Sequence, residues 1–264
     1  MDIKAYNRKA WDSEVIRKNI WTVPVSSRQI ERARKGKWEI FLTPRKPVPP
    51  MWIGEVRDKK VLCLASGGGQ QGPILAAAGA VVTVFDNSTK QLEQDQFVAK
   101  RDGLDIDTVQ GDMRDLSRFE NRSFDLIIHP VSNTFVPDIL PVWKEAYRVL
   151  KEGGSLLSGF DNPVNHLFDW DEVEKTKQLK VKFKIPYSDE KHLDKHLLKA
   201  MIKNKQPLEF GHSLQNQLGG QIQAGFILIG YYDDSDPVDE NPLAKYIANY
   251  GATNALKIEI SKKI

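Results

Sequence analysis

The chain has 264 residues, 41% of them hydrophobic and 28% charged, which excludes a wholly disordered chain and leaves room for one well-buried core but not for two large domains. Its net charge of +3 is too small to indicate nucleic-acid binding by itself. The start of the chain has no apolar leader, the apolar runs are only strand-length, and the single cysteine, Cys63, has no disulfide partner, so we expect a soluble cytoplasmic protein without a membrane span.

Residues 1–56 form an arm that precedes any regular alternation of strands and helices. The arm contains four of the six tryptophans, so we expect it to bury aromatic surface against the rest of the molecule: Trp11, Trp21, Trp38 and Trp52. It ends in the proline-rich stretch 43–50, which favours an extended connector. A basic cluster in the arm is interpreted as a solvated helix face, with structured RNA as the alternative: Arg28, Arg32, Arg34, Lys35 and Lys37.

Residues 57–160 alternate between short apolar strands and helical patterns. The predicted strands are 61–65, 81–85, 106–109, 124–128 and 155–160. The predicted helices are 72–79, from the capping Ser88 to about Arg101, and from Pro137 to the Gly153-Gly154 pair. This alternation predicts an α/β fold with a doubly wound, mostly parallel sheet.

The alternation breaks after Phe160. Residues 161–207 are interpreted as an insertion or lid, with a short alternating stretch and a charged helix. A helix over 214–220 and a strand over 226–232 return to the core, and the tail carries a short helix and a further possible strand over 256–260. We therefore divide the chain into an amino-terminal cap (1–56) and one α/β domain (57–264).

The most informative motif is VLCLASGGGQQG, at 61–72. A strand followed at once by Gly67, Gly68 and Gly69 and then by a helix allows a bound nucleoside to approach main-chain N–H groups, because glycines leave room for a tight turn. In α/β folds ligands bind outside the carboxyl ends of the strands, which is where this loop must lie.

Two further loops follow neighbouring strands and carry matching chemistry. Asp86 closes the second strand, where a carboxylate can accept hydrogen bonds from ribose hydroxyls. Gly111, Asp112 and Met113 follow the third strand, where Asp112 can accept from an adenine amino group while Met113 packs on the ring. The three loops together predict an adenosine cofactor.

A nicotinamide cofactor is the competing interpretation. Gly67, Gly69 and Gly72 also fit the dinucleotide pattern, and Tyr147 and Lys151 have the spacing of the catalytic pair in short-chain reductases. That pair, however, lies in the last turn before the fifth strand, at the edge of the sheet opposite the expected cleft. The placement argues against an NAD(P)-dependent reductase.

These residues resemble the class I S-adenosylmethionine-dependent methyltransferases, in particular the small-molecule group of ubiquinone and menaquinone biosynthesis (methyltransferase type 11). The likeness covers 58–160 and returns at 208–232; it includes the three loops, the segment 123–125 and the helix ending 147–154. The resemblance implies S-adenosylmethionine as cofactor. The cofactor-binding residues it implies, with neighbours of the same loops and of a cap helix, are Tyr6, Asn7, Trp11, Ser66, Gly67, Gly68, Gly69, Asp86, Asn87, Gly111, Asp112, Met113, His129 and Pro130.

Two positions depart from the family pattern. Members usually have an acidic residue where Cys63 stands and a glycine where Ala65 stands. The acid normally helps to hold the amino group of the cofactor, so Ser66, His129 or a group from the arm must replace it. The missing acid is also the feature that would favour a non-catalytic S-adenosylmethionine-binding protein.

The resemblance implies methyl transfer by in-line displacement at the sulfonium, with the acceptor about 3 Å from the methyl carbon in a site closed to water. A general base is needed only if the acceptor must lose a proton. The candidates for that role are His129, Asn133 and His212, and no catalytic residue is assigned. We expect a small-molecule acceptor, no metal and no nucleic acid; the methylated atom and the oligomeric state are left open.

Overall fold

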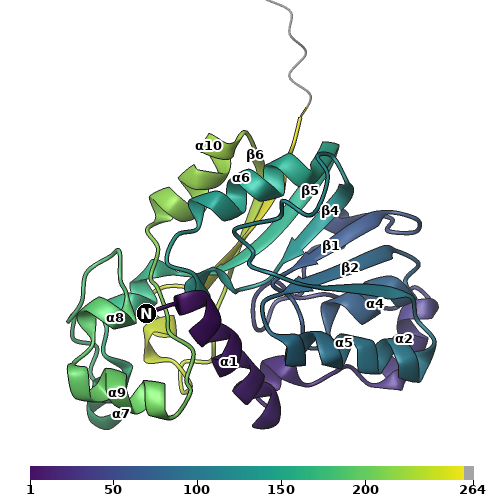
Figure 1. Cartoon of the computed structure of the whole chain (residues 1–264). Coiled ribbons are helices and arrows are strands. Elements are labelled where there is room, and N and C mark those ends of the chain that lie inside the picture. The colour runs from purple at the N-terminus through teal and green to yellow at the C-terminus, as the bar shows by residue number, and fades with distance from the viewer. Residues whose placement is uncertain (259–264) are drawn as a thin grey trace, which may run out of the picture.

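The computed structural model describes residues 1–258, which form a seven-stranded sheet with helices on both faces (Figure 1). The order across the sheet is β3-β2-β1-β4-β5-β7-β6. The bounds are β1 Lys60–Leu64, β2 Val81–Asp86, β3 Ile106–Gln110, β4 Phe124–His129, β5 Leu150–Asp161, β6 Ile227–Asp234 and β7 Tyr250–Leu256. The first five strands pair in parallel, and β7 runs antiparallel between β5 and β6. The predicted α/β fold is confirmed.

The helices separate onto the two faces of the sheet. One face is covered by α2 (Ser27–Arg34), α4 (Gln71–Ala77) and α5 (Thr89–Asp102), and the other by α6 (Leu140–Val149) and α10 (Gly220–Ala224). Each face buries its own apolar cluster. The central strands are therefore apolar on both sides, as expected for a covered parallel sheet.

Helix α5 shows how local sequence sets an element. The Ser88 hydroxyl accepts from the N–H of Gln91 at 3.1 Å, which begins the helix as predicted. Gly103 ends it in the left-handed conformation, with φ of 63°. Leu92 and Val98 of its buried face pack on the sheet. The helix thus holds the loop that follows β2 in place.

The predicted bounds of α6 were wrong at both ends. The helix begins at Leu140 rather than Pro137, because the Asp138 carboxylate accepts from the N–H of Leu140 and Pro141 occupies its first turn. It ends at Val149, before the Gly153-Gly154 pair, which lies inside β5. Pairing of β5 with β4 overrides the glycine signal, and the register shift between Phe124 and Leu126 absorbs the extra residues.

Two predictions for the carboxyl-terminal part also need correction. The helix predicted over 214–220 continues to Ala224 through a π-helical turn, Gln215–Gly219, in which the carbonyl of Asn216 accepts from the Trp143 indole at 2.8 Å. The strand predicted over 256–260 has the wrong bounds, because β7 spans Tyr250–Leu256 and shares only Leu256 with the prediction. Positions 257 and 258 are not in a strand, and positions 259 and 260 lie outside the described residues. The small side chains of β7 fit between β5 and β6, where a Cβ on Gly251 would lie 2.7 Å from the Tyr231 hydroxyl.

The amino-terminal arm contains α1 (Ile3–Ile16), a 3₁₀ turn at Ile20–Thr22, α2 and α3 (Pro50–Ile53). Helix α1 packs on α5, and α2 packs on α4. The basic cluster of α2 and the residues after it is exposed, as expected for a solvated face. Three of the four tryptophans are half-buried, but Trp21 is 46% exposed.

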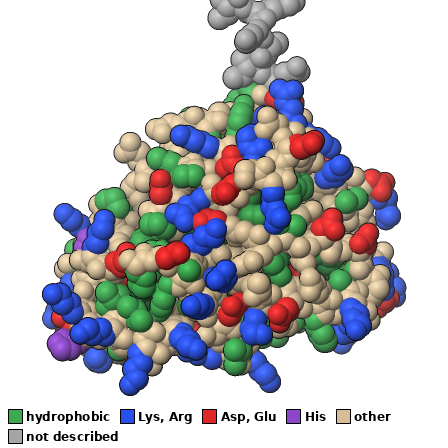
Figure 2. Space-filling model, in the orientation of Figure 1, with side chains coloured by type: hydrophobic (Ala, Val, Ile, Leu, Met, Phe, Trp, Pro, Cys, Tyr) green, Lys and Arg blue, Asp and Glu red, His purple; other side chains and the backbone are tan. Residues whose placement is uncertain are grey.

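The segment after β5 forms a lobe beside α1 (Figure 1). It contains a 3₁₀ turn at Pro163–Leu167 and helices α7 (Trp170–Thr176), α8 (Asp189–His192) and α9 (Lys195–Lys203). Figure 2 shows hydrophobic side chains, with acidic ones beside them, over the region where α8 meets α1, and basic side chains around the outer rim of the lobe. Within residues 1–258, no helix is both long enough and apolar enough to cross a membrane.

Candidate functional site

The glycine loop after β1 is held in a shape that side chains would obstruct. Gly68 and Gly69 have φ of 114° and 73°, in the left-handed region. A Cβ on Gly68 would lie 2.9 Å from the carbonyl oxygen of Trp21, and one on Gly69 would lie 2.9 Å from that of Gln94. These two glycines therefore allow the arm and α5 to pack closely around the loop.

Two carboxylates fix the same loop. Asp86, at the end of β2, accepts from the N–H of Gly67 at 3.0 Å, and Asp95, in the middle of α5, accepts from the N–H of Gly68 at 3.0 Å. Asp95 is fully buried, and burial raises its pKa to about 8. The sequence does contain a sign of this role. Leu92, Asp95 and Val98 share one helix face by their spacing, and an acid on a buried helix face needs a hydrogen-bonding partner.

Asp95 also lies near the position where the family acid is missing. Burial raises the pKa of the Cys63 thiol, and the charge of Asp95 raises it further. An uncharged thiol in β1 thus faces a carboxylate supplied from α5. Asp95 does not line the cavity, so it holds the glycine loop rather than a ligand.

A cavity of about 850 Å³ opens at the carboxyl ends of the parallel strands and is bounded by the arm and the lobe. Ten of the fourteen predicted cofactor residues line it: Asn7, Trp11, Ser66, Gly67, Asp86, Asn87, Gly111, Asp112, Met113 and Pro130. Gly68, Gly69, His129 and Tyr6 do not line it. We call the part formed by the loops after β1, β2 and β3 the cofactor end.

The cofactor end contains buried polar atoms that have no partner. The hydroxyl of Ser66 and the amide oxygens of Asn87 and Gln91 are all buried, and none has a hydrogen-bond partner among the described residues. Buried polar atoms are normally paired, so these three are suited to the hydroxyl and amino groups of an adenosine cofactor. Gln91 is not part of any recognised motif, and sequence reasoning missed it.

Asp86 is the central carboxylate of this end. Its Oδ1 accepts from the N–H of Ser88 at 2.8 Å and its Oδ2 from that of Gly67 at 3.0 Å. Each carboxylate oxygen can accept a second hydrogen bond. Burial raises the pKa of Asp86 to about 6, and the carboxylate of Asp12 adds to this effect. The group can therefore change charge just below neutral pH.

Asp112 is already paired. The guanidinium of Arg114 contacts it at 2.6 Å from Nη2 to Oδ2, and Nε lies 3.0 Å from Oδ1. Burial opposes the charge, but these hydrogen bonds hold the pKa of Asp112 below its ordinary value. A ligand amino group at this position would share the carboxylate with Arg114, a partner that the sequence motif does not reveal.

The three candidate bases are buried behind the cavity wall. His129 is 0% exposed; its Nδ1 lies 2.9 Å from the Leu64 carbonyl oxygen and its Nε2 lies 2.7 Å from Oδ1 of Asn133. His212 is held at 2.9 Å from the carbonyl oxygen of Val136. Burial lowers the pKa of both histidines. Neither histidine nor Asn133 lines the cavity, so the structure does not bring His129 to the expected place of the sulfonium.

Helix α1 connects the arm to the lobe. The Asn7 amide donates to the carbonyl oxygens of Phe135 and Leu208, each at 2.9 Å, and accepts from the N–H of Leu208 at 2.9 Å. The Tyr6 hydroxyl donates to the carbonyl oxygen of Gln206 at 2.8 Å. Trp11 meets Phe135 edge to face, with ring centroids 4.9 Å apart. These residues brace the wall of the cavity, and Tyr6 does so from outside it.

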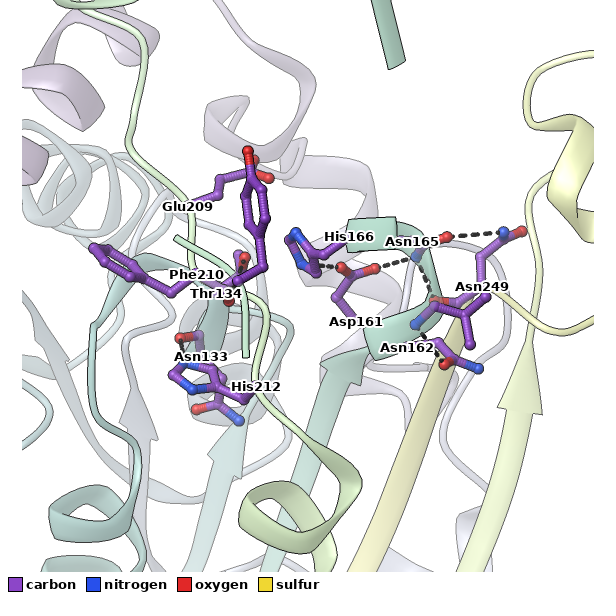
Figure 3. Close-up of polar contacts among 12 residues, drawn as sticks. Asn133, Thr134, Asp161, Asn162, Asn165, His166, Glu209, Phe210, His212 and Asn249 are labelled. Carbon is purple, nitrogen blue, oxygen red and sulfur yellow. Dashed lines mark hydrogen bonds and ion pairs between the residues drawn. The ribbon is translucent and has the colours of Figure 1, made fainter. Parts of the chain in front are cut away.

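The lobe supplies a second group of polar residues, which we call the lobe end of the cavity (Figure 3). Asp161, the last residue of β5, pairs with His166, with 2.7 Å between Oδ2 and Nε2, and also accepts from the Asn165 amide. Burial opposes the positive charge of His166, but Asp161 raises its pKa overall. Glu209 lines the same end, where burial raises its pKa to about 7. No sequence motif indicated this cluster.

The Tyr-Lys pair of the reductase interpretation lies away from the cavity. The Lys151 ammonium donates to Asp125 at 2.7 Å, and the Tyr147 ring packs edge to face on Phe226. Neither residue lines the cavity. The placement predicted from the sequence is confirmed, and a nicotinamide reductase is not favoured.

Comparison with known proteins agrees with this geometry. A family model described as a methyltransferase domain matches residues 62–158. The uncharacterized methyltransferase YbaJ of Bacillus subtilis (strain 168) is 57% identical over 254 residues, which cover 96% of this chain and 98% of that protein. The ubiquinone biosynthesis O-methyltransferase of Actinobacillus pleuropneumoniae serotype 5b (strain L20) is 33% identical over 102 residues, 37% of this chain and 44% of that protein.

A solved structure shares the fold over most of the chain. It is the 1,6-didemethyltoxoflavin-N1-methyltransferase of Burkholderia thailandensis, with bound 1,6-didemethyltoxoflavin and S-adenosylhomocysteine. The likeness has a TM-score of 0.58 at 15% identity and covers 97% of this chain and 88% of that one. With the extended identity to YbaJ and the residues of the cofactor end, the conclusion is that this chain belongs to the S-adenosylmethionine-dependent methyltransferases.

Proposed function

We propose that the protein transfers the methyl group of S-adenosylmethionine to a small molecule held in the lobe end of the cavity. The observation that carries this proposal is a single cavity, about 850 Å³ in volume, that joins the cofactor end to the lobe end. Ligand sites in proteins commonly measure about 300–1,000 Å³, so the space is suited to a cofactor and a compact acceptor together.

The residues proposed to hold the cofactor are those of the cofactor end. Asp86 would accept from the ribose hydroxyls, and the unpaired polar atoms of Ser66, Asn87 and Gln91 would pair with the remaining polar groups. Met113 and the Asp112–Arg114 pair would bound the adenine. The bound sulfonium supplies an activated methyl group, and the protein's part is to orient the acceptor and exclude water.

The arm (1–56) and the insertion (161–207) are proposed to act together as the cover of this site within one domain (57–264). Support comes from the contacts of α1, because Asn7 and Tyr6 bind the backbone at the carboxyl end of the insertion. Residues of both segments line the cavity. A cover of this kind favours an acceptor small enough to be enclosed over a large macromolecule.

The acceptor itself must be inferred from this chain. Of the proteins named above, one is described as a ubiquinone biosynthesis O-methyltransferase and another as a 1,6-didemethyltoxoflavin-N1-methyltransferase. Acceptors and methylated atoms thus differ between proteins that share the fold, because function depends on the residues of the site. In this chain, the residues of the lobe end would determine which acceptor is bound.

The test is calorimetric titration with S-adenosylmethionine, S-adenosylhomocysteine, NADH and NADPH in parallel. We expect the first two to bind in the micromolar range, about −8 kcal/mol, and the nicotinamide nucleotides not to bind. Binding of a nicotinamide nucleotide alone would overturn the proposal. A binding-competent protein that releases no S-adenosylhomocysteine with any acceptor of a broad panel would instead favour a non-catalytic binding role.

A further inference from the structure

The lobe end of the cavity has an excess of negative charge. Asp161, Asp189 and Glu209 lie around one histidine, His166, whose pKa is influenced by all three carboxylates. They come from different elements: the end of β5, the start of α8 and the segment before the π-helical turn. Because His166 carries at most one positive charge, it cannot balance the three carboxylates.

Lysine and arginine side chains do not neutralise this negative charge. The lysine and the arginine among the described cavity-lining residues are Lys4 and Arg114. Arg114 is paired with Asp112 at the cofactor end, and the charge of Lys4 also acts on Asp112. An acceptor that carries its own carboxylate or phosphate would therefore meet more negative than positive charge at the lobe end, where His166 is the basic side chain among the described cavity-lining residues.

Glu209 is the carboxylate that lacks a partner. Asp161 is bound by His166 and Asn165, and Asp189 accepts from the Tyr187 hydroxyl at 2.8 Å and from the backbone N–H of Glu209 at 2.7 Å. The side chain of Glu209 is solvent-exposed where it lines the cavity, and it makes no hydrogen bond or ion pair with any residue of the described chain. A carboxylate that lines the cavity and has no protein partner is free to pair with a cation that enters with the ligand.

Aromatic rings line the same end: Phe168, Trp170, Phe183, Tyr187 and Tyr250. Tyr187 stacks on His166, with ring centroids 5.4 Å apart and an interplanar angle of 24°. Aromatic faces attract cations, and the attraction is stronger when water is excluded. Charge and ring composition thus favour the same class of ligand.

On the basis of the proposed methyltransferase function, we propose that the lobe end binds a small amine, free of acidic groups, as its ammonium ion, and that Glu209 pairs with this ion and accepts its proton. The site is an N-methylation site. Figure 3 shows Glu209 and His166 on neighbouring segments, with Asp161 bound to both His166 and Asn165.

The step balances in atoms and charge. The ammonium N–H bond breaks and its proton goes to Glu209, which frees the nitrogen lone pair. That pair forms the new C–N bond with the methyl carbon, while the C–S electron pair returns to sulfur and leaves a neutral thioether. The positive charge moves from sulfur to nitrogen, and the proton on Glu209 passes to water. Because Glu209 has a pKa of about 7, it can accept and release a proton near neutral pH.

The experiment compares three probes of similar shape on the protein saturated with S-adenosylhomocysteine: 2-phenylethylamine, 2-phenylethanol and phenylacetate. Calorimetry should show the amine bound tightest, by roughly ten- to a hundredfold over the alcohol, and phenylacetate bound weakest. Methylamine and spermidine extend the amine series in size. In Glu209→Gln the preference for amine over alcohol should disappear, while the affinity for S-adenosylhomocysteine is unchanged.

Glu174→Gln is the matched control, since Glu174 is an exposed acid of the same lobe that does not line the cavity; it should keep the wild-type preference. Thermal unfolding of both variants checks that they fold. Equal binding of alcohol and amine, a preference retained in Glu209→Gln, or no binding of any of the three amines at millimolar concentration would overturn the amine proposal. If the wild-type protein did not bind S-adenosylhomocysteine, that result would instead count against the methyltransferase function itself.

Discussion

Asp86 and Asp95 hold adjacent peptide groups of the glycine loop, yet they differ in what else they can do. Asp86 lines the cavity and has lone pairs available to a ligand, whereas Asp95 is fully buried under the loop. Burial raises the pKa of both, to about 6 and about 8. Asp86 is therefore suited to binding, and Asp95 to positioning the loop.

The affinity for S-adenosylmethionine should depend on Asp86 and on pH. Asp86→Ala should weaken binding by roughly 1.5–3 kcal/mol, the cost of losing hydrogen bonds to a charged group. The ionised carboxylate of Asp86 accepts more hydrogen bonds from the cofactor than the protonated group does. The affinity of the wild-type protein for S-adenosylmethionine should therefore fall as pH decreases through about 6. Titration calorimetry from pH 5 to about 8 would measure this. Asp86→Asn should show a flat profile over the same range; a variant with wild-type affinity and profile would remove Asp86 from the site.

Asp95 should make the folded state less stable at high pH. Its pKa is raised from 3.8 to about 8, so the folded protein holds the proton more tightly than the unfolded chain does. The free energy of unfolding of the wild type, relative to Asp95→Asn, should therefore fall between pH 4 and about 8, by on the order of 1–3 kcal/mol. Urea denaturation across this range provides the measurement. Asp86 and Glu209 make the stability of both proteins fall with pH in the same way. The informative quantity is therefore the difference in free energy of unfolding between the wild type and Asp95→Asn. A difference that does not change with pH would contradict the raised pKa of Asp95.

At the scale of elements, α1 is the connection between the arm and the lobe. Its hydrogen bonds to the lobe come from Asn7, Tyr6 and the C-cap residue Arg17 and go to backbone groups, so they do not depend on the side chains of the lobe. The same helix packs on α5, which carries Asp95. One helix thus touches both the cover of the cavity and the element under the glycine loop.

Asn7→Ala should loosen this connection. The change leaves the buried N–H and carbonyl of Leu208 and the carbonyl of Phe135 without their partner, at a cost on the order of 2 kcal/mol. Hydrogen–deuterium exchange should then become faster in the segment 204–209, with little change in the central strands. Ser13→Ala is the control, because its hydroxyl bonds only within α1 at an exposed position. Unchanged exchange at 204–209 in Asn7→Ala would show that the lobe is held by other contacts.

At the scale of the whole molecule, two apolar clusters on opposite faces of the sheet support a cavity at one edge of it. The cavity walls come from the arm, from the loops of the parallel strands and from the lobe, which are far apart along the chain. A ligand that fills the cavity therefore contacts all three segments.

Binding of S-adenosylhomocysteine should protect the arm and the lobe together. Limited proteolysis should cut the exposed segments of both more slowly in its presence, because ligand binding to the folded state lowers the population of open forms. Melting temperature should rise with ligand concentration in the same samples. With Asp86→Ala the protection should need correspondingly more ligand. Protection confined to the glycine loop would contradict a cavity shared by the three segments.

The parallel half of the fold and the cofactor loops could be predicted because their signals are local. Apolar runs of strand length, the glycines after β1, and the acids that end β2 and follow β3 each depend on a few consecutive residues. The hydrogen bonds of a covered parallel sheet and the close approach of backbone to a nucleoside require those residue types at those places. Most predicted cofactor residues accordingly line the cavity, and the family was evident before the structure.

The tertiary structure alone decided the rest, because those features depend on contacts between distant segments. The burial of His129 against Asn133 and the pairing of Asp112 with Arg114 decide which groups a ligand can reach. Asp95 meets the glycine loop only when α5 packs on β2 and β3. Glu209 and His166 line one cavity only after the lobe folds against the sheet, since the charge inside a cavity is a property of the packed molecule rather than of any stretch of its sequence.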